Sequence, residues 1–273
     1  MKTIPFTKMS AAGNDFILID NRAAVVDAAR GSELARSICR RKLSVGADGL
    51  ILIEDSPRAD FKWRFFNADG SEAEMCGNGG RCAARFAYHG GFAPAALSFE
   101  TLAGIIKAEI LQDRVKLELP PASRPELGIT LMLDGVPYTV SSITVGVPHA
   151  VVLVDDLEGC PVVTLGRQIR FHDRFKPAGT NADFVSIKDG STIAVRTYER
   201  GVEDETLACG TGSVASALIA GVTRGMASPL SVITRGGEIL TVHFAWKQGM
   251  PVELFLEGGA DFIYEGQFYE TLT

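Results

Sequence analysis

A short glycine-rich stretch of this chain occurs twice. Residues 76–79 are Cys-Gly-Asn-Gly and residues 209–212 are Cys-Gly-Thr-Gly, and each is followed by a run of small residues that is typical of a helix. A glycine-rich turn into a helix leaves several backbone N–H groups unpaired at the positive end of the helix dipole. We therefore expect two helices that each begin beside a cysteine, where a thiol ionises more easily and an anion can be held.

The spacing of 133 residues between the two copies recurs along the chain. The other matched pairs are Gly13 and Gly146, Gly46 and Gly179, Leu97 and Leu230, Ser98 and Ser231, Thr101 and Thr234, and Gly104 and Gly237. A single Cys-Gly-x-Gly stretch is more typical of a tight turn with a buried, inert cysteine. Two copies in matched surroundings instead predict a tandem duplication of one unit of about 130 residues, the size of a domain.

The repeat predicts an N-terminal domain over residues 1–119 and a C-terminal domain over residues 120–260. The proline-rich stretch 120–125 is the best candidate for the linker. Residues 261–273 have no counterpart at this spacing, and we expect them to cross back onto the first domain. If the two domains face each other, their cysteine loops lie on opposite sides of a shared cleft, which is a usual place for a small-molecule site.

The predicted fold class is α+β, with two pseudo-symmetric domains that are each a curved, mostly antiparallel sheet wrapped around a central cysteine helix. The strands that alternation and turn residues predict in the first half lie near the start of the chain and at 16–20, 50–54, 61–66, 97–101, 104–111 and 115–119. Those of the second half lie around 138–154 and at 183–188, 192–198, 230–234, 238–246 and 251–257. The predicted helices are 32–42, with Ser32 as N-cap, 76–91, one near 164–171, and 209–221.

Composition narrows the class of protein. Hydrophobic residues make up 46% of the 273 residues and charged residues 22%, as in globular proteins. The net charge of −6 argues against a nucleic-acid partner. No apolar run is long enough to span a membrane and the first residues lack a signal peptide, so we expect a cytoplasmic protein without a membrane partner.

The cysteines predict reduced thiols. The five residues form an odd set without a Cys-x-x-Cys pair or the framework of a secreted disulfide protein. Cys39 falls on the apolar face of a predicted helix, and Cys82 and Cys160 are expected to be structural as well. Cys76 and Cys82 do not have a usual zinc spacing, and no histidines cluster near them, so no metal site is expected.

Two thiols on opposite sides of a carbon suit one kind of chemistry. One thiolate can remove a proton from one face while a second thiol delivers a proton to the other, which inverts a stereocentre. Two helix N-termini can stabilise the charge that develops on the substrate carboxylate. No motif for pyridoxal phosphate (PLP) or flavin is present, and this chemistry needs no cofactor.

Other functions remain open on the residues alone. Two facing cysteines could form a disulfide, as in a thiol redox protein. A cysteine hydrolase would use one nucleophile and leave the duplication unexplained. The Gly-x-Gly runs are a poor dinucleotide fingerprint, because no acidic residue follows a βαβ unit.

Several of these stretches resemble the diaminopimelate epimerase family. The matched motifs are Gly-Asn-Asp-Phe at 13–16, Phe-Asn-Ala-Asp-Gly-Ser at 66–71, Cys-Gly-Asn-Gly at 76–79, Tyr-Glu-Arg-Gly at 198–201 and Ala-Cys-Gly-Thr-Gly at 208–212, and the match runs from about residue 9 to 237. The resemblance implies a PLP-independent enzyme that interconverts LL- and meso-diaminopimelate, a step towards lysine and peptidoglycan. It also implies that Cys76 and Cys209 are the acid/base pair, and that the protein is a homodimer.

The resemblance further implies a set of substrate contacts. They are Asn14, Asn67, Gly77, Asn78, Asn181, Glu199, Arg200, Gly210 and Thr211, while His149 and Glu199 would tune the thiol pKa values. Arg200 suits a bidentate carboxylate clamp. Each residue has a structural alternative: Asn14 and Asn67 lie in turn sequences, Glu199 and Arg200 could be a solvated pair, and a lone histidine is usually structural.

The chain departs from the family at three places. Val147 stands where many members have asparagine, Gly49 where some have glutamine, and the loop from Glu199 to Cys209 is one residue longer than the commonest pattern. Valine cannot replace the hydrogen bonds of an amide, so these changes bear on the distal end of the substrate. A proline-racemase-like enzyme or hydroxyproline epimerase is the nearest alternative, but such enzymes typically have histidine where this chain has Asn78.

Overall fold

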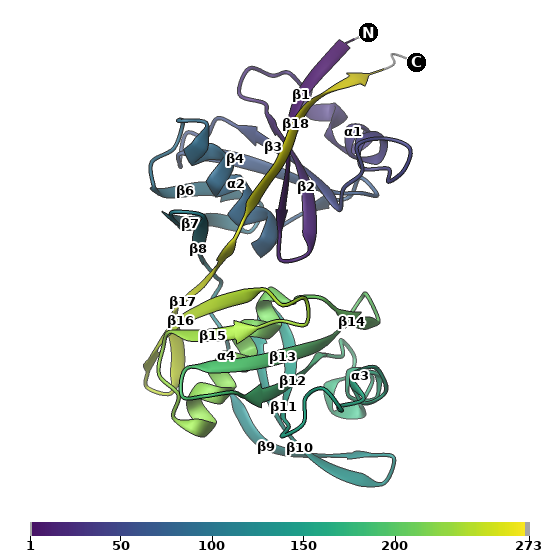
Figure 1. Cartoon of the computed structure of the whole chain (residues 1–273), viewed down its shortest axis with the longest axis vertical. Coiled ribbons are helices and arrows are strands. Elements are labelled where there is room, and N and C mark those ends of the chain that lie inside the picture. The colour runs from purple at the N-terminus through teal and green to yellow at the C-terminus, as the bar shows by residue number, and fades with distance from the viewer. Residues whose placement is uncertain (1, 271–273) are drawn as a thin grey trace. The chain divides into compact units, whose positions relative to one another are not determined.

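The structure, a computed structural model, describes residues 2–270, without the side chains of Lys2 and Ala28. It forms two compact units: unit 1 comprises residues 2–117 with 258–270, and unit 2 comprises residues 118–257 (Figure 1). Residue 1 of the expected first domain and residues 271–273 of the expected returning segment lie outside the described part of the chain.

Unit 1 is a mixed sheet with two α-helices among its described residues. Its elements are β1 (Lys2–Ala11), β2 (Asn14–Asp20), a 3-10 turn (Ala28–Arg30), α1 (Gly31–Ile38), β3 (Gly49–Glu54), β4 (Phe61–Asn67), β5 (Glu72–Ala73), α2 (Gly77–His89), β6 (Ala96–Thr101), β7 (Gly104–Leu111), β8 (Arg114–Glu118) and β18 (Asp261–Glu270). Strand pairs β2–β3 and β4–β6 are parallel, and the others printed within the unit are antiparallel.

Unit 2 has a similar order of elements, except that an additional strand comes first and the 3-10 turn follows the first helix. Its elements are β9 (Glu126–Leu133), β10 (Val136–Val145), β11 (Val147–Leu153), α3 (Val162–Arg170), a 3-10 turn (Asp173–Phe175), β12 (Asn181–Ile187), β13 (Thr192–Glu199), β14 (Asp204–Thr206), α4 (Gly210–Arg224), β15 (Leu230–Ile233), β16 (Ile239–Lys247) and β17 (Met250–Gly259). The parallel pairs β11–β12 and β13–β15 correspond to those of unit 1. The predicted fold class is therefore confirmed: two similar units, each with a mostly antiparallel sheet around one central helix.

The last strand belongs to unit 1. β18 runs antiparallel beside β1, with Lys2 opposite Glu270 and Ser10 opposite Asp261 (Figure 1). In unit 2 the strand that pairs with β10 in the same way is β9, which directly precedes it. Residues 261–270 thus have a structural counterpart in β9, although they have none at the 133-residue spacing.

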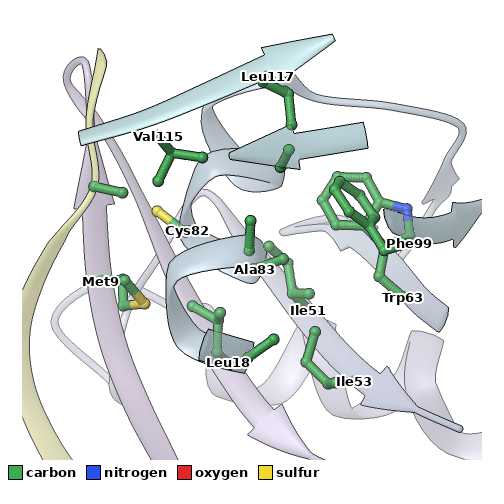
Figure 2. Packing of buried hydrophobic residues seen from close by; sticks show 14 of the residues in the cluster. Met9, Leu18, Ile51, Ile53, Trp63, Cys82, Ala83, Phe99, Val115 and Leu117 are labelled. Carbon is green, nitrogen blue, oxygen red and sulfur yellow. The ribbon is translucent and has the colours of Figure 1, made fainter. Parts of the chain in front are cut away.

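The helix α2 lies in an apolar core. Cys82 and Ala83 on this helix are fully buried, and Val115, Leu117 and Met9 belong to the same cluster of side chains (Figure 2). Close packing explains the small residues of the helix, because an added Cβ at Gly79 would lie 3.2 Å from Ile51 and 3.4 Å from Trp63. In unit 2, α4 is packed in the same way and is buried from Gly212 to Gly221.

The central strands are covered on both faces. In β3, Ile51 and Ile53 belong to the core around α2, whereas Leu50 and Leu52 belong to a second core with Leu34 of α1. A continuous apolar run is the sequence pattern of such a strand. Unit 2 has the same arrangement, with a second core that includes residues of α3 and β12.

The helix predicted at 32–42 extends four residues too far at its C-terminal end, and the predicted N-cap, Ser32, is wrong. The helix ends at Ile38, and Lys42 has a left-handed φ of 67°. The N-cap is Arg30, while the Ser32 hydroxyl instead donates to the Gly70 carbonyl (2.7 Å). Beyond the helix end, Arg41 pairs with Asp15 of β2 and with Asp48 of its own loop.

Four strands were not predicted. The two short ones, β5 and β14, lie in stretches expected to be loops. The eight-residue β9 follows the proposed linker directly, and β18 forms the segment that was expected only to cross back onto the first domain. β5 and β14 each pair with a longer strand across a turn, β4 and β13 respectively. Two- and three-residue strands have no sequence period of their own, so only this pairing defines them.

Candidate active site

Both cysteines of the repeated stretch occupy the N-cap position of a helix. Cys76 precedes α2 with φ −143° and ψ 119°, and Cys209 precedes α4 with φ −120° and ψ 112°. The extended backbone of an N-cap directs its side chain back towards the first N–H groups of the helix. The Gly212 N–H donates to the Cys209 sulfur at 3.4 Å, and the Thr211 hydroxyl lies 3.6 Å from it.

In unit 1 two asparagines meet beside Cys76. The Asn78 side chain, 7% exposed, donates from Nδ2 to Asn14 Oδ1 at 2.7 Å. Asn14 begins β2 and in turn donates from Nδ2 to Asp48 Oδ2 at 3.0 Å. The structure thus brings Asn14, Gly77 and Asn78 together at the start of α2.

A cluster of charges supports this pair of amides. Arg41 donates to both oxygens of Asp15 (2.5 and 3.1 Å) and to Asp48 Oδ1 (2.7 Å). Lys8, which is 6% exposed, lies 2.8 Å from Asp15 Oδ2 and also donates to the Gly46 carbonyl. These four charged residues were not among the predicted site residues.

Asn67 lies at the end of β4, opposite Gly49 of β3. Its backbone N–H donates to the Ser71 carbonyl at 2.9 Å, and its Nδ2 donates to the Ser71 hydroxyl at 3.0 Å. The next residue, Ala68, donates from its N–H to the Asp48 carbonyl at 3.0 Å. Asn67 therefore stabilises the turn that it begins, which is the structural role considered for it above. A backbone hydrogen bond joins the same turn to Asp48.

In unit 2 a buried histidine is fixed by a carboxylate. His149 Nδ1 lies 2.8 Å from Asp183 Oδ2, and both side chains are fully buried. Thr197 donates to the other Asp183 oxygen at 2.7 Å. Because the carboxylate can only accept, Nδ1 carries the proton and Nε2 is left as an acceptor, 3.5 Å from Asn181 Nδ2.

Arg200 is placed by Asn181 and keeps its charge available. Its backbone N–H donates to Asn181 Oδ1 at 2.7 Å. Its guanidinium donates to the Ala178 carbonyl at 3.2 Å and meets no carboxylate within residues 2–270. The solvated pair of Glu199 with Arg200 is thus not formed in this structure, and a half-buried cation is left to receive an anion.

Burial opposes ionisation of both thiols. It raises the pKa of Cys209 to about 12, and the negative charges of Glu199 and Asp183 add to this. Burial likewise raises the pKa of Cys76, against the N–H groups of Gly79 and Asn78. The expectation of an easily ionised thiol is therefore wrong, because loss of hydration outweighs the helix N-terminus.

Glu199 has its own perturbed pKa. Burial raises the pKa of its carboxyl group, the charge of Asp183 raises it further, and His149 lowers it. The negative charge of Asp183 thus raises the pKa of both Glu199 and Cys209, and the charge of Glu199 raises that of Cys209.

Comparisons with known proteins identify the family of the chain. The family model described as diaminopimelate epimerase matches residues 6–124 and 141–255. Diaminopimelate epimerase of Aquifex aeolicus is 48% identical over 277 residues, which cover 97% of this chain and 98% of that protein. The enzyme of Archaeoglobus fulgidus is 41% identical over 276 residues, covering 96% and 95%.

The chain belongs to the diaminopimelate epimerase family. The resemblance indicated by the motifs is thereby confirmed, and with it the class of enzyme, an isomerase acting on a small amino acid. Solved structures share the fold. A PhzF-family phenazine biosynthesis protein of Bacillus anthracis has a TM-score of 0.76 at 16% identity, with 99% of this chain and 100% of that chain covered. A hydroxyproline epimerase of Agrobacterium vitis has a TM-score of 0.68 at 17% identity, covering 98% and 92%.

In this member of the diaminopimelate epimerase family, two of the three departures lie at the start of a strand. Gly49 begins β3, and a Cβ there would lie 2.4 Å from the Phe65 ring and 2.8 Å from the Phe66 carbonyl. Val147 begins β11 and is half-buried. The Phe65 side chain thus occupies the space that a larger residue at position 49 would need.

The remaining cysteines of this family member are free thiols, and Cys39 and Cys82 are fully packed. Burial raises the pKa of the half-buried Cys160. Among residues 2–270 no group of three or more metal-binding side chains gathers, and no helix is long and apolar enough to cross a membrane.

Sequence reasoning missed the residues that hold the predicted ones. Asp183 orients His149, and Asp48 orients Asn14. The sequence did contain a signal for Asp48, because this residue matches Asn181 at the 133-residue spacing and both residues are polar. Arg41 also had a signal, because it matches Arg174 at the same spacing, whereas Lys8 matches Ser141 and had none.

Proposed function

We propose that this protein interconverts LL- and meso-diaminopimelate with Cys76 and Cys209 as its acid/base pair. The observation that carries the proposal is that both units hold the cysteine at the same N-cap position, with N–H groups of the helix turned towards it. In a member of the diaminopimelate epimerase family this duplicated thiol suits removal and delivery of a proton at one carbon.

The proposed reaction keeps every atom of the substrate. The thiolate of one cysteine removes the α-proton, so that the C–H bond breaks and an S–H bond forms. The thiol of the other cysteine then gives its proton to the opposite face of the same carbon. The N–H groups at the two helix starts stabilise the negative charge on the α-carboxylate in between. The shared cleft that this requires stays a prediction.

The substrate contacts are proposed in the same way. The unpaired guanidinium of Arg200 suits the second carboxylate of diaminopimelate, which proline lacks. Asn181 supports this use because it anchors the Arg200 backbone. Asn14, Asn67, Gly77, Asn78, Glu199, Gly210 and Thr211 complete the proposed set, and His149 acts with Glu199 on the thiols. No cofactor is required by this proposal.

The proposal is tested by proton NMR of LL-diaminopimelate with the reduced protein in deuterium oxide. We expect the α-proton signal to disappear while the meso isomer forms. L-proline and trans-4-hydroxy-L-proline are incubated in parallel tubes. Exchange only in a proline tube would keep the two-thiol reaction and overturn the substrate, whereas no exchange in any tube would favour a redox or binding protein.

Variants of the two cysteines test their roles. Cys76→Ser and Cys209→Ser should each lower the epimerisation rate on the order of a hundredfold or more, because an alcohol is a much weaker acid than a thiol. Cys82→Ser is the matched control, since this thiol is fully buried in the core of unit 1 (Figure 2). Near-normal epimerisation by either of the first two variants would exclude a two-thiol mechanism.

We also propose that the protein is a cytoplasmic homodimer serving lysine and peptidoglycan synthesis. Two large apolar side chains on β18, Ile263 and Tyr264, are exposed at 55% and 46% and would be covered in a dimer. Light scattering coupled to gel filtration measures the mass, which should be twice that of one chain. A mass of one chain at micromolar concentration would exclude a stable dimer.

A further inference from the structure

Asn14 stands between a carboxylate and a second amide. Its Nδ2 donates to Asp48 Oδ2 at 3.0 Å, and its Oδ1 accepts from Asn78 Nδ2 at 2.7 Å. A carboxylate can only accept hydrogen bonds, so the nitrogen end of Asn14 must face Asp48. The oxygen end then faces Asn78, which is left to donate with its own nitrogen. The negative charge of Asp48 thus fixes the direction of two amides in series.

Asp48 is itself held in place. Arg41 Nη2 donates to its Oδ1 at 2.7 Å, and the Asp15 N–H donates to its Oδ2 at 3.2 Å. The Asp48 N–H returns a hydrogen bond to Asp15 Oδ1 at 3.0 Å. Lys8 pairs with Asp15, so two cations balance two carboxylates. These contacts hold both oxygens of Asp48 in fixed positions beside Asn14.

The amide chain ends at the proposed reaction centre. Asn78 is the second residue of α2, two positions after the N-cap Cys76, and its side chain is buried. Within residues 2–270 its side chain makes one hydrogen bond, the one to Asn14. With Nδ2 anchored there, Oδ1 is kept in one direction as an acceptor and cannot exchange places with the nitrogen.

We propose that Asp48 is a positioning residue for the reaction: through Asn14 it fixes which end of the Asn78 amide is presented to the amino acid beside Cys76. The carbonyl end suits the substrate ammonium group, which is a donor only. This role rests on the proposed function. If the Asn78 amide could rotate by 180°, it would present its NH₂ group about half of the time, and this donor group repels the ammonium hydrogens.

A purely electrostatic role makes the opposite prediction. Besides burial, the charge of Asp48 contributes to raising the pKa of Cys76. If Asp48 acted through charge alone, Asp48→Asn would lower the pKa of Cys76 and increase its thiolate fraction at neutral pH. Proton removal would then become faster rather than slower. The pH dependence of α-proton exchange separates the two roles.

The first test compares Asp48→Asn with Asp20→Asn. Asp20 forms an exposed pair with Arg22 at the end of β2 opposite to Asn14, so the control also removes a carboxylate that pairs with an arginine, but one outside the chain of amides. We expect Asp48→Asn to lower kcat/KM for α-proton exchange on the order of tenfold to a hundredfold, and Asp20→Asn to leave it unchanged. Unchanged or faster exchange in Asp48→Asn, with the profile shifted to lower pH, would overturn the proposal.

The second test uses the swapped pair Asp48→Asn with Asn14→Asp. In this double variant the new amide at position 48 donates to the new carboxylate at position 14, which still accepts from Asn78. The direction of the Asn78 amide is thereby restored, and the net charge is unchanged. The double variant should recover part of the activity lost by Asp48→Asn. A double variant no better than Asp48→Asn would contradict a role exerted through Asn14.

The third test needs no substrate and therefore stands apart from the proposed function. The side-chain NH₂ signals of Asn14 and Asn78 are followed by ¹H–¹⁵N NMR, with Asn78→Asp providing the assignment. In Asp48→Asn both pairs of signals should move, although Asp48 does not contact Asn78. If only the Asn14 signals move, the relay is absent. If both move while wild-type protein shows no exchange with diaminopimelate, the relay stands and the proposed function fails.

Discussion

At Cys209 the protein applies two opposing effects to one thiol. The Gly212 N–H donates to the sulfur, which favours the thiolate, whereas burial and the charge of Glu199 favour the protonated thiol and raise its pKa to about 12. Burial dominates because the thiolate loses its hydration while a single long N–H contact replaces it. These effects together favour the protonated thiol at Cys209, the form that can give a proton.

This balance predicts the reactivity of Cys209 towards iodoacetamide. Because the thiolate is the nucleophile and its fraction below the pKa rises tenfold per pH unit, alkylation should be slow at pH 7 and accelerate about tenfold per unit towards pH 10. Glu199→Gln removes a charge that raises the pKa, so alkylation at a given pH should be roughly threefold to tenfold faster.

Peptide mass spectrometry after timed alkylation measures Cys209 separately from the other thiols. Asp204→Asn is the control, because it removes a charge from the same loop that does not act on this thiol. A rate that levels off near pH 7 would contradict the raised pKa. Equal rates in Glu199→Gln and Asp204→Asn would contradict the stated cause.

At the scale of elements, each cysteine helix depends on glycines at its start. Gly212 lies against the groups that orient His149, because an added Cβ would lie 2.4 Å from Asp183 Oδ1, 3.1 Å from Thr197 Oγ1 and 3.2 Å from the Cys209 sulfur. Gly77 at the start of α2 has no atom within 4 Å of such a Cβ. The helix α4 therefore approaches its sheet more closely than a side chain at 212 permits.

Gly212→Ala should therefore lower the free energy of unfolding by about 1–3 kcal/mol, as overpacking of a fully packed site does. Gly77→Ala should change it little or raise it slightly, since alanine is the better helix former and the space is open. Urea unfolding followed by circular dichroism measures both variants. A Gly212→Ala protein as stable as Gly77→Ala would show that the Asp183 carboxylate moves aside without cost.

The same elements show what the sequence can predict. The helices α2 and α4 follow from a glycine-rich start and a run of small residues, and β3 from its continuous apolar run. The strands β5 and β14 could not be predicted, because they exist only through pairing with β4 and β13. Nor could the charged cluster of Arg41 with Asp15 and Asp48 be predicted, since it joins Asp15 of β2 to two residues of the connection between α1 and β3.

At the scale of the molecule, unit 1 is completed by a strand from the far end of the sequence. β18 pairs with β1 along its length, and Glu270 forms an ion pair with Arg30 at 2.8 Å. Arg85 donates to the Ala260 carbonyl at 2.6 Å, so the segment is also held against α2. The cysteine spacing could predict the duplication, but the pairing of β18 with β1 depends on contacts across more than 200 residues.

Removal of residues 261–270 should unfold unit 1 and leave unit 2 folded. β1 loses its hydrogen-bonding partner, a loss larger than the roughly 5 kcal/mol that a marginally stable domain has in reserve. Hydrogen exchange read by mass spectrometry should show loss of protection over residues 2–117 and not over 118–257. Gln267→Ala is the control, because it changes an exposed side chain and keeps the strand. Retained protection in β1 of the shortened protein would contradict this dependence.

The place of β18 also sets an order of events during translation. On the ribosome, residues 2–117 emerge first but lack the strand that closes their sheet. Residues 118–257 emerge next with every strand of their own sheet present, including β9 ahead of β10. The unit made second can therefore finish folding first, while the unit made first must wait as an open sheet until residues 258–270 leave the exit tunnel. A chaperone that binds nascent chains would find its longest-lived target in β1.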